Sequence, residues 1–226
     1  MSKSIIILQA RTSSKRLPGK VLKKINGIPL VVLCAKRLQN RGDNLIVATS
    51  NEKSDDKLVK VLINEKINYF RGDLKNVFSR YLTISKKYNN NDLILRATAD
   101  NPLPDGNLVD TVIKHFNSIR NDYFGIDHTL HNLPHGISLE IFYAKKIIKT
   151  GKMVLSADDK EHVTLKMYKN IKIPNLLIKS IKIKNNLSNV NYSVDEKKDL
   201  LKVRKLFKKV KNPIKISLKK LLKRTI

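Results

Sequence analysis

Four cations lie close together in a short segment near the start of the chain. This segment, Gln9–Lys20 (QARTSSKRLPGK), carries Arg11, Lys15, Arg16 and Lys20 among several hydroxyl side chains. Guanidinium and ammonium groups, aided by the backbone N–H groups of a loop, bind phosphate oxygens. We therefore expect a polyphosphate site here, although neither the GxxxxGK(S/T) nor the GxGxxG pattern is present. On charge alone, a solvated basic loop is an equally good interpretation.

A carboxylate follows an apolar run in the middle of the chain. Asp100 lies in Arg96–Pro102 (RATADNP), just after the run Asp92–Thr98. A carboxylate in such a place can hold Mg²⁺ against phosphates, because Mg²⁺ takes few protein ligands, prefers hard oxygen atoms and shares those of the substrate. The alternative is that Asp100 caps a turn before Pro102, which is a common role of aspartate.

Two expected strands position these segments. Ser4–Ala10 is apolar without alternation, as a strand buried on both faces is, and Asp92–Thr98 is expected to be a second buried strand. Ligands of open parallel sheets bind beyond the carboxyl ends of the strands, so both segments fall where a ligand is expected. Further apolar runs alternate with segments of helical period, which is typical of an α/β fold. The other expected strands are Leu45–Thr49, Ile67–Phe70, Asn121–Gly125, Ser138–Tyr143, Leu176–Ile183 and Val190–Val194. The expected helices are Pro29–Gln39, Ser54–Glu65, Leu74–Tyr88, Gly106–Ile119, Asp158–Lys169 and Glu196–Lys209.

The motif Q-A-R-x-x-S-x-R-L-P-G-K resembles the opening signature of cytidylyltransferases that make CMP-activated acidic sugars, the CMP-Kdo and CMP-sialic acid synthetases. It looks closest to their spore-coat-polysaccharide (SpsF-like) branch. The resemblance continues in order along nearly the whole chain, through Arg71–Tyr81, Arg96–Pro102, Leu133–Gly136 with Glu140, Glu161–Thr164 and Tyr192–Leu200. Residues 1–226 are therefore expected to form a single Rossmann-like nucleotidyltransferase domain with a mostly parallel sheet flanked by helices.

The resemblance implies roles for individual residues. Arg16, Lys20 and Asp100 would be the catalytic residues, and Asp100 and Asp195 would be the paired ligands of Mg²⁺. Nucleotide-binding residues would be Ala10, Arg11, Ser13, Arg16, Lys20, Asp73, Arg80 and Arg96. Acceptor-binding residues would be His135, Glu140, Glu161 and His162, the last two lying there or at a subunit contact.

Two positions depart from the pattern of this branch. Ala99 stands where the branch usually has glycine, which gives the backbone before Asp100 less freedom. Asn101 stands where cysteine or glutamate is usual, which leaves the identity of the acceptor open. His128 and His131 in the same polar loop as His135 invite a zinc interpretation, but no matching cysteine is present, and exposed or substrate-facing histidines are the expected alternative.

The implied reaction transfers CMP from CTP to an acidic sugar or related acceptor, with release of pyrophosphate, in surface polysaccharide or glycan biosynthesis. A glycosyltransferase is a close alternative, because it shares the architecture and a metal–diphosphate site. A basic nucleic-acid-binding protein is the alternative of another class. The formal net charge of +27 favours it, but aromatic residues make up only 6% of the chain and no nucleic-acid-binding motif is present. We therefore do not expect a nucleic-acid partner.

The basic residues are concentrated toward the end of the chain. Thirteen of the 46 Lys and Arg residues lie between Lys197 and Arg224, and Asp199 is the one acidic residue there. The sequence is also rich in Ile and Asn. An AT-rich genome would produce the same excess of Lys, Ile and Asn, so the high charge does not by itself indicate a partner. We expect the basic segment 212–226 to be peripheral to catalysis, with its leucines packed as one turn of an amphipathic helix.

The remaining features point to a cytoplasmic protein. No stretch approaches the roughly 18–20 apolar residues of a membrane span, and charge returns at Arg11 before a signal-peptide core could form. Cys34 is the one cysteine, which fits a reducing compartment, and its place on an apolar helix face predicts a small core residue. The resemblance implies a homodimer, although the sequence does not fix the oligomeric state.

Overall fold

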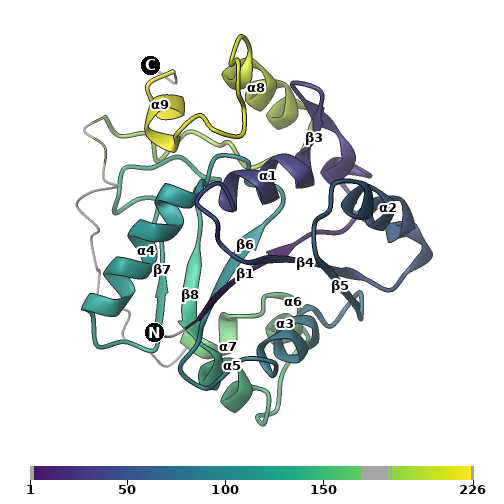
Figure 1. The fold of residues 1–226 in the computed structure, drawn as a ribbon, viewed down its shortest axis with the longest axis vertical. Helices are drawn as coiled ribbons and strands as arrows, with labels where there is room; N and C mark the ends of the chain where they lie inside the picture. Colours follow the sequence, from purple (N-terminus) through teal and green to yellow (C-terminus); the bar gives the residue numbers. More distant parts are fainter. Residues whose placement is uncertain (1–2, 169–182, 184, 225–226) are drawn as a thin grey trace.

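The centre of the fold is a six-stranded sheet in the order β5-β4-β1-β6-β8-β7 (Figure 1). This computed structural model describes residues 3–168, 183 and 185–224. Strands β5, β4, β1 and β6 are parallel, and β8 runs antiparallel to both of its neighbours. The predicted mostly parallel α/β sheet is therefore confirmed. Its strands are β1 (Ser4–Gln9), β4 (Leu45–Ser50), β5 (Tyr69–Gly72), β6 (Leu93–Thr98), β7 (Tyr123–Gly125) and β8 (Glu140–Tyr143).

Strand β1 is covered on both faces. Ile6 and Leu8 belong to one cluster of buried apolar side chains, whereas Ile5 and Ile7 belong to a second cluster. Successive side chains of a strand point to opposite faces, so the sheet separates the two clusters. This double burial explains why Ser4–Ala10 is apolar without alternation.

Helices cover the two faces of the sheet. Figure 1 shows α1, α8 and α9 on one side and α3, α5, α6 and α7 on the other. The hairpin of β2 (Lys24–Ile25) and β3 (Ile28–Pro29) leads into α1, and the short 3₁₀ helices η1 (Lys20–Leu22) and η2 (Lys53–Asp55) follow β1 and β4. The helices are α1 (Leu30–Leu38), α2 (Asp56–Asn64), α3 (Val77–Ser85), α4 (Gly106–Ser118), α5 (Ala144–Thr150), α6 (Ala157–Glu161), α7 (Leu165–Tyr168), α8 (Lys197–Phe207) and α9 (Leu218–Leu222). No helix of the described ranges is long and apolar enough to cross a membrane.

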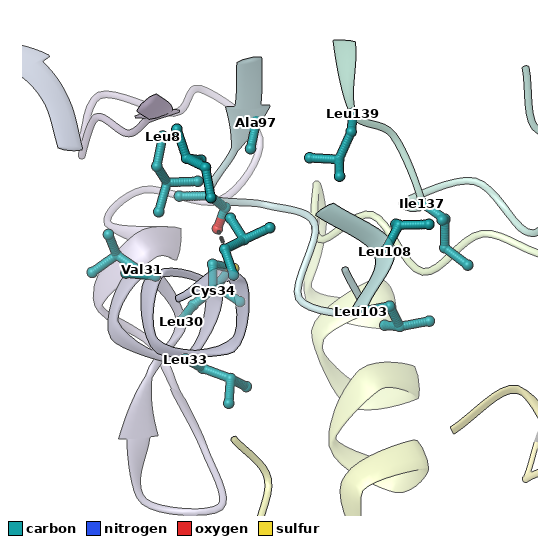
Figure 2. Close-up of a cluster of buried hydrophobic side chains, with 14 of the residues drawn as sticks. Leu8, Leu30, Val31, Leu33, Cys34, Ala97, Leu103, Leu108, Ile137 and Leu139 are labelled. Carbon is teal, nitrogen blue, oxygen red and sulfur yellow. Dashed lines mark hydrogen bonds between the residues drawn. The ribbon is translucent and has the colours of Figure 1, made fainter. Parts of the chain in front are cut away.

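Helix α1 packs against the sheet below the ends of β1 and β6. Figure 2 shows Leu30 and Cys34 of this helix in one buried cluster with Leu8 and Ala97. The Cys34 thiol donates to the Ala99 carbonyl at 3.5 Å, and burial raises the pKa of this thiol far above its ordinary value. Cys34 is thus a small core residue, as predicted, and it packs beneath the loop that carries Asp100.

Three expected elements differ from the structure. The helix predicted over Asp158–Lys169 is wrong, because the chain forms α6 and α7 with a break at His162–Thr164, where Val163 has a φ of 44°. The strand predicted over Val190–Val194 reduces to a single bridge between Asn191 and His135. The strand expected at Leu176–Ile183 lies outside the described residues except for its last position.

Candidate active site

The loops after β1 and β6 leave the same edge of the sheet side by side. Gln9 pairs with Thr98 at the carboxyl ends of these neighbouring strands, and the Ala99 amide donates to the Gln9 carbonyl at 2.9 Å. The chain passes from β1 to β4 on one side and later to β6 on the other. Such a divergence of neighbouring loops creates the crevice where open α/β sheets bind ligands.

Lys20 lies between two carboxylates in this crevice. Its Nζ atom donates to Asp100 Oδ2 and to Asp195 Oδ1, each at 2.9 Å. Gly19 adopts a φ of 67° just before η1, a conformation that glycine tolerates at little cost, and this turn directs the chain so that Lys20 follows. Only 11% of the Lys20 side chain is exposed. Burial lowers the pKa of Lys20, but the two carboxylates raise it by more, so the side chain stays an ammonium ion.

Asp195 reaches this position through backbone contacts. The Val194 amide donates to the Asp100 carbonyl at 2.8 Å, which fixes the two carboxylate-bearing segments against each other. The amides of Asp195 and Glu196 donate to Asp199 Oδ2 at 3.2 and 2.9 Å, where α8 begins. Asp199 is therefore a capping residue of α8, and it stabilises the turn that presents Asp195.

The rest of the loop after β1 places cations along the crevice. Arg16 Nη2 lies 3.3 Å from Asp195 Oδ2, and 62% of the Arg16 side chain is exposed. Its Nη1 atom also lies 4.0 Å from Glu196 Oε1. An exposed guanidinium with two long ionic contacts of this kind can turn toward an incoming phosphate at little cost. Ser13 is exposed, whereas Ala10 is buried and donates its amide to the Ala48 carbonyl at 3.1 Å.

Asp55 is a functional candidate that the sequence reasoning missed. It is fully buried, and its carboxylate accepts from the amide and hydroxyl of Thr12 (2.7 and 2.6 Å), the hydroxyl of Thr49 (2.9 Å), and the amide and hydroxyl of Ser50. Burial raises the pKa of Asp55, but the hydrogen bonds from Ser50, Thr12 and Thr49 outweigh burial and lower it. The ionised carboxylate thus holds the loop after β1 to the end of β4. The helix expected over Ser54–Glu65 begins at Asp56, and the Asp55 side chain makes no capping hydrogen bond to it.

A second pocket, of about 560 Å³, opens at the other end of the loop and is lined in part by Arg11, Asp73 and Glu161. Arg11 Nη2 lies 3.4 Å from Glu161 Oε1. The Asp73 side chain accepts from the amides of Lys75 and Asn76 at 2.7 and 2.6 Å, and these bonds lower its pKa. The structure therefore brings two predicted nucleotide-binding residues together with Glu161, which was predicted to face the acceptor.

Arg80 is fully buried, and its charge interacts with those of Arg11 and Asp73, which line this pocket. Its Nη1 atom donates to the Ala48 carbonyl at 3.2 Å, while its Nε and Nη2 atoms have no hydrogen-bond partner among the described residues. Burial lowers the pKa of this guanidinium. Buried donors without partners are rare in folded proteins, so the unpaired Nε and Nη2 donors of Arg80, near Ala48, are consistent with a nucleotide contact.

Arg96 and Glu140 form an ion pair with each other. They lie opposite each other on β6 and β8 and form an ion pair with side chains that are 19% and 15% exposed. Glu140 also accepts from the hydroxyls of Tyr123 and Thr164. Burial raises the pKa of Glu140, but the Arg96 charge and these hydroxyls lower it by more. The predicted nucleotide and acceptor roles of the pair stay predictions, and the contacts seen are structural.

The four predicted acceptor-binding residues do not converge. His135 lines a pocket of about 550 Å³ that also includes Asp195 and Asn101. Glu161 lines the pocket of Arg11, Glu140 is paired with Arg96, and His162 is exposed between α6 and α7. Within the described ranges, no group of three or more His, Cys, Asp or Glu side chains is placed to hold a metal ion. The zinc interpretation of the histidine loop therefore gains no support.

A doubly covered sheet of this topology, with cations and paired carboxylates at its crevice, is the arrangement expected of a nucleotidyltransferase. The chain belongs to the cytidylyltransferase family, whose family model matches residues 5–220. It is thus an enzyme of the CTP-dependent nucleotidyltransferase class.

Three known proteins are similar to this chain in sequence or in fold. The chain is 36% identical over 176 residues to the uncharacterized protein MJ1063 of Methanocaldococcus jannaschii, covering 77% of this chain and 69% of that protein. It is 34% identical over 174 residues to the spore coat polysaccharide biosynthesis protein SpsF of Bacillus subtilis, covering 73% and 70%. A cytidylyltransferase structure from Leptospira borgpetersenii superposes with a TM-score of 0.84 over 99% of this chain and 93% of that chain, at 23% identity. The likeness to SpsF agrees with the branch expected from the motifs.

Proposed function

We propose that this enzyme transfers CMP from CTP to an acidic sugar or a related acceptor and releases pyrophosphate. The observation that supports this most directly is the convergence of Asp100 and Asp195 on Lys20, beside the cationic loop after β1. The acceptor oxygen attacks the α-phosphorus of CTP and loses its proton, while the bond from the α-phosphorus to the oxygen of the leaving pyrophosphate breaks. Because such chemistry depends on positioning and charge neutralisation, a cluster of fixed charges suits it.

The protein's own residues divide the work along the crevice. Lys20 and Arg16 bind the triphosphate, the first as a buried ammonium and the second as an exposed guanidinium. Arg11 and Asp73 line the pocket that would hold the nucleoside. The unpaired N–H groups of Arg80 would donate hydrogen bonds to the nucleoside, after a small movement of the loop that follows β1.

The same proposal includes Mg²⁺, with Asp100 and Asp195 as its ligands. Asp100 Oδ2 and Asp195 Oδ1 each accept a hydrogen bond of 2.9 Å from the Lys20 ammonium group, so the two oxygen atoms lie close together. The positive charge of Lys20 already lies between them. The two side chains are 26% and 30% exposed, which leaves room for water and phosphate oxygens as further ligands. When bound, Mg²⁺ would supply charge neutralisation at the phosphates.

The test is pyrophosphate release from CTP by the purified protein, with Mg²⁺ and a panel of sugar acids. Phosphorus NMR should show a CMP-linked product with CTP and little or none with ATP, GTP or UTP. Pyrophosphate release with none of the acceptors would contradict the proposal. Release of a nucleoside diphosphate or monophosphate from a finished nucleotide-sugar, without use of CTP, would show a glycosyltransferase instead. We also propose that the reaction takes place in the cytoplasm and serves surface polysaccharide or glycan synthesis.

A further inference from the structure

A pocket of about 430 Å³ lies just beyond the C-terminal end of α8. Its described lining contains five exposed cations and no aspartate or glutamate, and none of the five forms an ion pair with another described residue. A cleft lined by one sign of charge concentrates ions of the other sign, so this pocket is suited to an anion. The cations are Lys209, Lys211, Lys215, Lys220 and Arg224.

The loop that carries Lys215 is held to the body of the protein by Arg37. This residue of α1 is fully buried, and its Nη1 atom donates to the carbonyls of Pro213 and Ile216 at 2.7 and 2.8 Å. Its Nη2 atom donates to the Leu103 carbonyl at 2.7 Å. A site whose parts are in place before the ligand arrives loses less conformational entropy on binding. The backbone of the Lys215 loop is preorganised in this sense.

The turn after α8 brings further cations to the same pocket. Lys209 has a φ of 62°, a left-handed conformation that glycine or asparagine usually takes at the end of a helix. The Val210 amide donates to the Phe207 carbonyl at 3.0 Å and closes this turn. The Arg224 Nη2 atom donates to the Lys208 carbonyl at 2.6 Å, which holds the chain after α9 against the turn. Figure 1 shows α8 and α9 at the same end of the molecule.

This pocket is separate from the crevice of the candidate active site. Helix α8 begins at Lys197, close to Asp195, and its 11 residues end at Phe207. A helix of this length spans about 16 Å, and the pocket begins beyond its far end. None of the described residues that line it also lines the pocket of Arg11 or that of Asp195. An anion can therefore bind there while the crevice is occupied.

We propose that this pocket is a second anion site, which binds a compact soluble ligand with two or more phosphate groups. A phosphate group carries up to two negative charges, and lysine binds phosphate as a point charge. One carboxylate would neutralise only one of the five cations, so several phosphate charges match the lining better. An extended polyanion such as DNA requires a stripe of cations. These five instead line one pocket, whose volume lies in the range of small-molecule sites, about 300–1,000 Å³.

Calorimetry with inorganic tripolyphosphate and the full chain tests this proposal without CTP or turnover. The pocket variant combines Lys209→Gln, Lys215→Gln and Lys220→Gln, all at exposed positions. It should weaken binding at one site by roughly tenfold or more, because charge-assisted contacts are lost. Lys20→Ala should leave this site unchanged and affect only tripolyphosphate that binds in the crevice. Failure of the CTP reaction would therefore leave binding at the pocket intact.

The matched control combines Lys202→Gln, Lys205→Gln and Lys208→Gln. These changes remove the same charge from exposed positions on or next to α8 that do not line the pocket. The control should bind tripolyphosphate as the wild type does. Equal loss in the control would mean that overall charge attracts the anion, and it would overturn the proposal. Unchanged binding by the pocket variant, or the absence of any site that survives Lys20→Ala, would overturn it as well.

Two further probes exclude an extended partner. A DNA duplex and vesicles of phosphatidylglycerol are titrated into the wild type, the pocket variant and the control. The proposal expects that neither probe distinguishes the pocket variant from the control. Tighter binding of either probe than of tripolyphosphate, lost in the pocket variant alone, would assign these lysines to nucleic acid or to a lipid surface and would overturn the compact ligand.

Discussion

Thr12 and Asp55 are joined by two hydrogen bonds, from the Thr12 amide at 2.7 Å and from its hydroxyl at 2.6 Å, both to Asp55 Oδ1. Through this contact Asp55, just before α2, holds a residue of the loop after β1, which is predicted to bind phosphate. The other carboxylate oxygen, Oδ2, accepts from Thr49 and Ser50 at the end of β4. Asp55 is therefore a positioning residue, because it connects the loop to the sheet without lying in the crevice itself.

Asp55→Asn should weaken CTP binding by roughly tenfold, since an amide cannot accept from all of these donors and the loop loses its anchor. The measurement is calorimetric CTP affinity, with KM and kcat for CTP beside it. We expect KM for CTP to rise more than kcat falls, and Asp55→Glu to restore part of the affinity. Asp56→Asn is the control, because Asp56 is half-exposed and pairs with Arg71. An Asp55→Asn protein of lowered stability but normal CTP affinity would reduce Asp55 to a purely structural residue.

The sequence could predict the places of Lys20 and Asp100, because each follows an apolar run long enough to be a strand and such strands end at one edge. It could not predict Asp55 as a long-range acceptor. Ser-Asp-Asp before a helix is typical of a cap. Asp55 instead accepts hydrogen bonds from Thr12 and Ser50, and these residues come near each other only because β1 pairs with β4.

The positions of Asp195 and Glu140 also could not be derived from the sequence alone. Asp195 was assigned through the family resemblance. The strand expected just before it reduces to a single bridge, and its segment is held against Asp100 by one backbone hydrogen bond, from the Val194 amide. Glu140 was expected to face the acceptor, but the register of β6 and β8 sets it opposite Arg96. Such a cross-strand pair can be predicted only when the register of the two strands is known. Arg96 and Glu140 are 44 positions apart, and a single sequence does not reveal which residues of two such strands lie opposite each other.

Asp100→Asn and Asp195→Asn should each lower turnover by at least about a hundredfold, which corresponds to roughly 3 kcal/mol of transition-state stabilisation. The fold should survive, since asparagine keeps an oxygen for the Thr98 hydroxyl that donates to Asp100 at 2.6 Å. Steady-state kinetics over a range of Mg²⁺ concentrations measures the effect. Asp110→Asn, in an exposed ion pair with Arg41, should behave as wild type. Near-normal turnover of either active-site variant at ordinary Mg²⁺ would rule out the metal assignment.

Lys20→Ala and Arg16→Ala should each weaken CTP binding or slow the reaction, because one charge-assisted contact contributes about 1.5–3 kcal/mol. Lys20→Ala should be the more damaging change, since it also leaves two carboxylates facing each other without a counterion. Calorimetry with CTP and initial rates measure both variants. Lys24→Ala removes an equal charge from an exposed site on β2 and should change neither quantity. Unchanged affinity and rate in the two loop variants would show that the loop is a solvated basic segment.

Glu140→Gln should lower the free energy of unfolding by about 3 kcal/mol, because it leaves the Arg96 guanidinium buried without its counterion. Urea unfolding at pH 7 measures this loss. Asp122→Asn, from an exposed pair with Lys146 at 4.0 Å, should cost less than about 1 kcal/mol. A variant with wild-type stability would show that the pair is easily replaced.

The same carboxylate should give the wild type an acid-sensitive component of stability. The folded state holds the pKa of Glu140 below its ordinary value. Its stabilisation is therefore complete above the unfolded value of about 4.3 and is lost as the pH falls through the folded value. The stability difference between wild type and Glu140→Gln should thus shrink in acid below about pH 4. A difference that stays constant down to pH 3 would contradict this linkage.

The basic C-terminal segment should tolerate loss of its exposed charge. Its leucines Leu218, Leu221 and Leu222 are buried on α9, as expected, and the Leu218 amide donates to Asp105 Oδ2 at 2.8 Å. Arg224 belongs to this framework as well, because its guanidinium donates to the carbonyls of Leu206 and Lys208. Changing it would mix a structural effect with the effect of charge.

The decisive variant therefore replaces the exposed lysines Lys215, Lys219, Lys220 and Lys223 by glutamine and keeps Arg224. We expect unchanged CTP turnover and unfolding free energy, since these exposed side chains do not line the pockets of Arg11 or Asp195 and make no described ion pair. Leu221→Ala, in contrast, should cost about 2–5 kcal/mol of stability. Loss of turnover in the folded glutamine variant would mean that the basic segment contributes to the active site. Retained turnover together with lost, salt-dependent binding to DNA would mean that this charge serves a nucleic-acid partner.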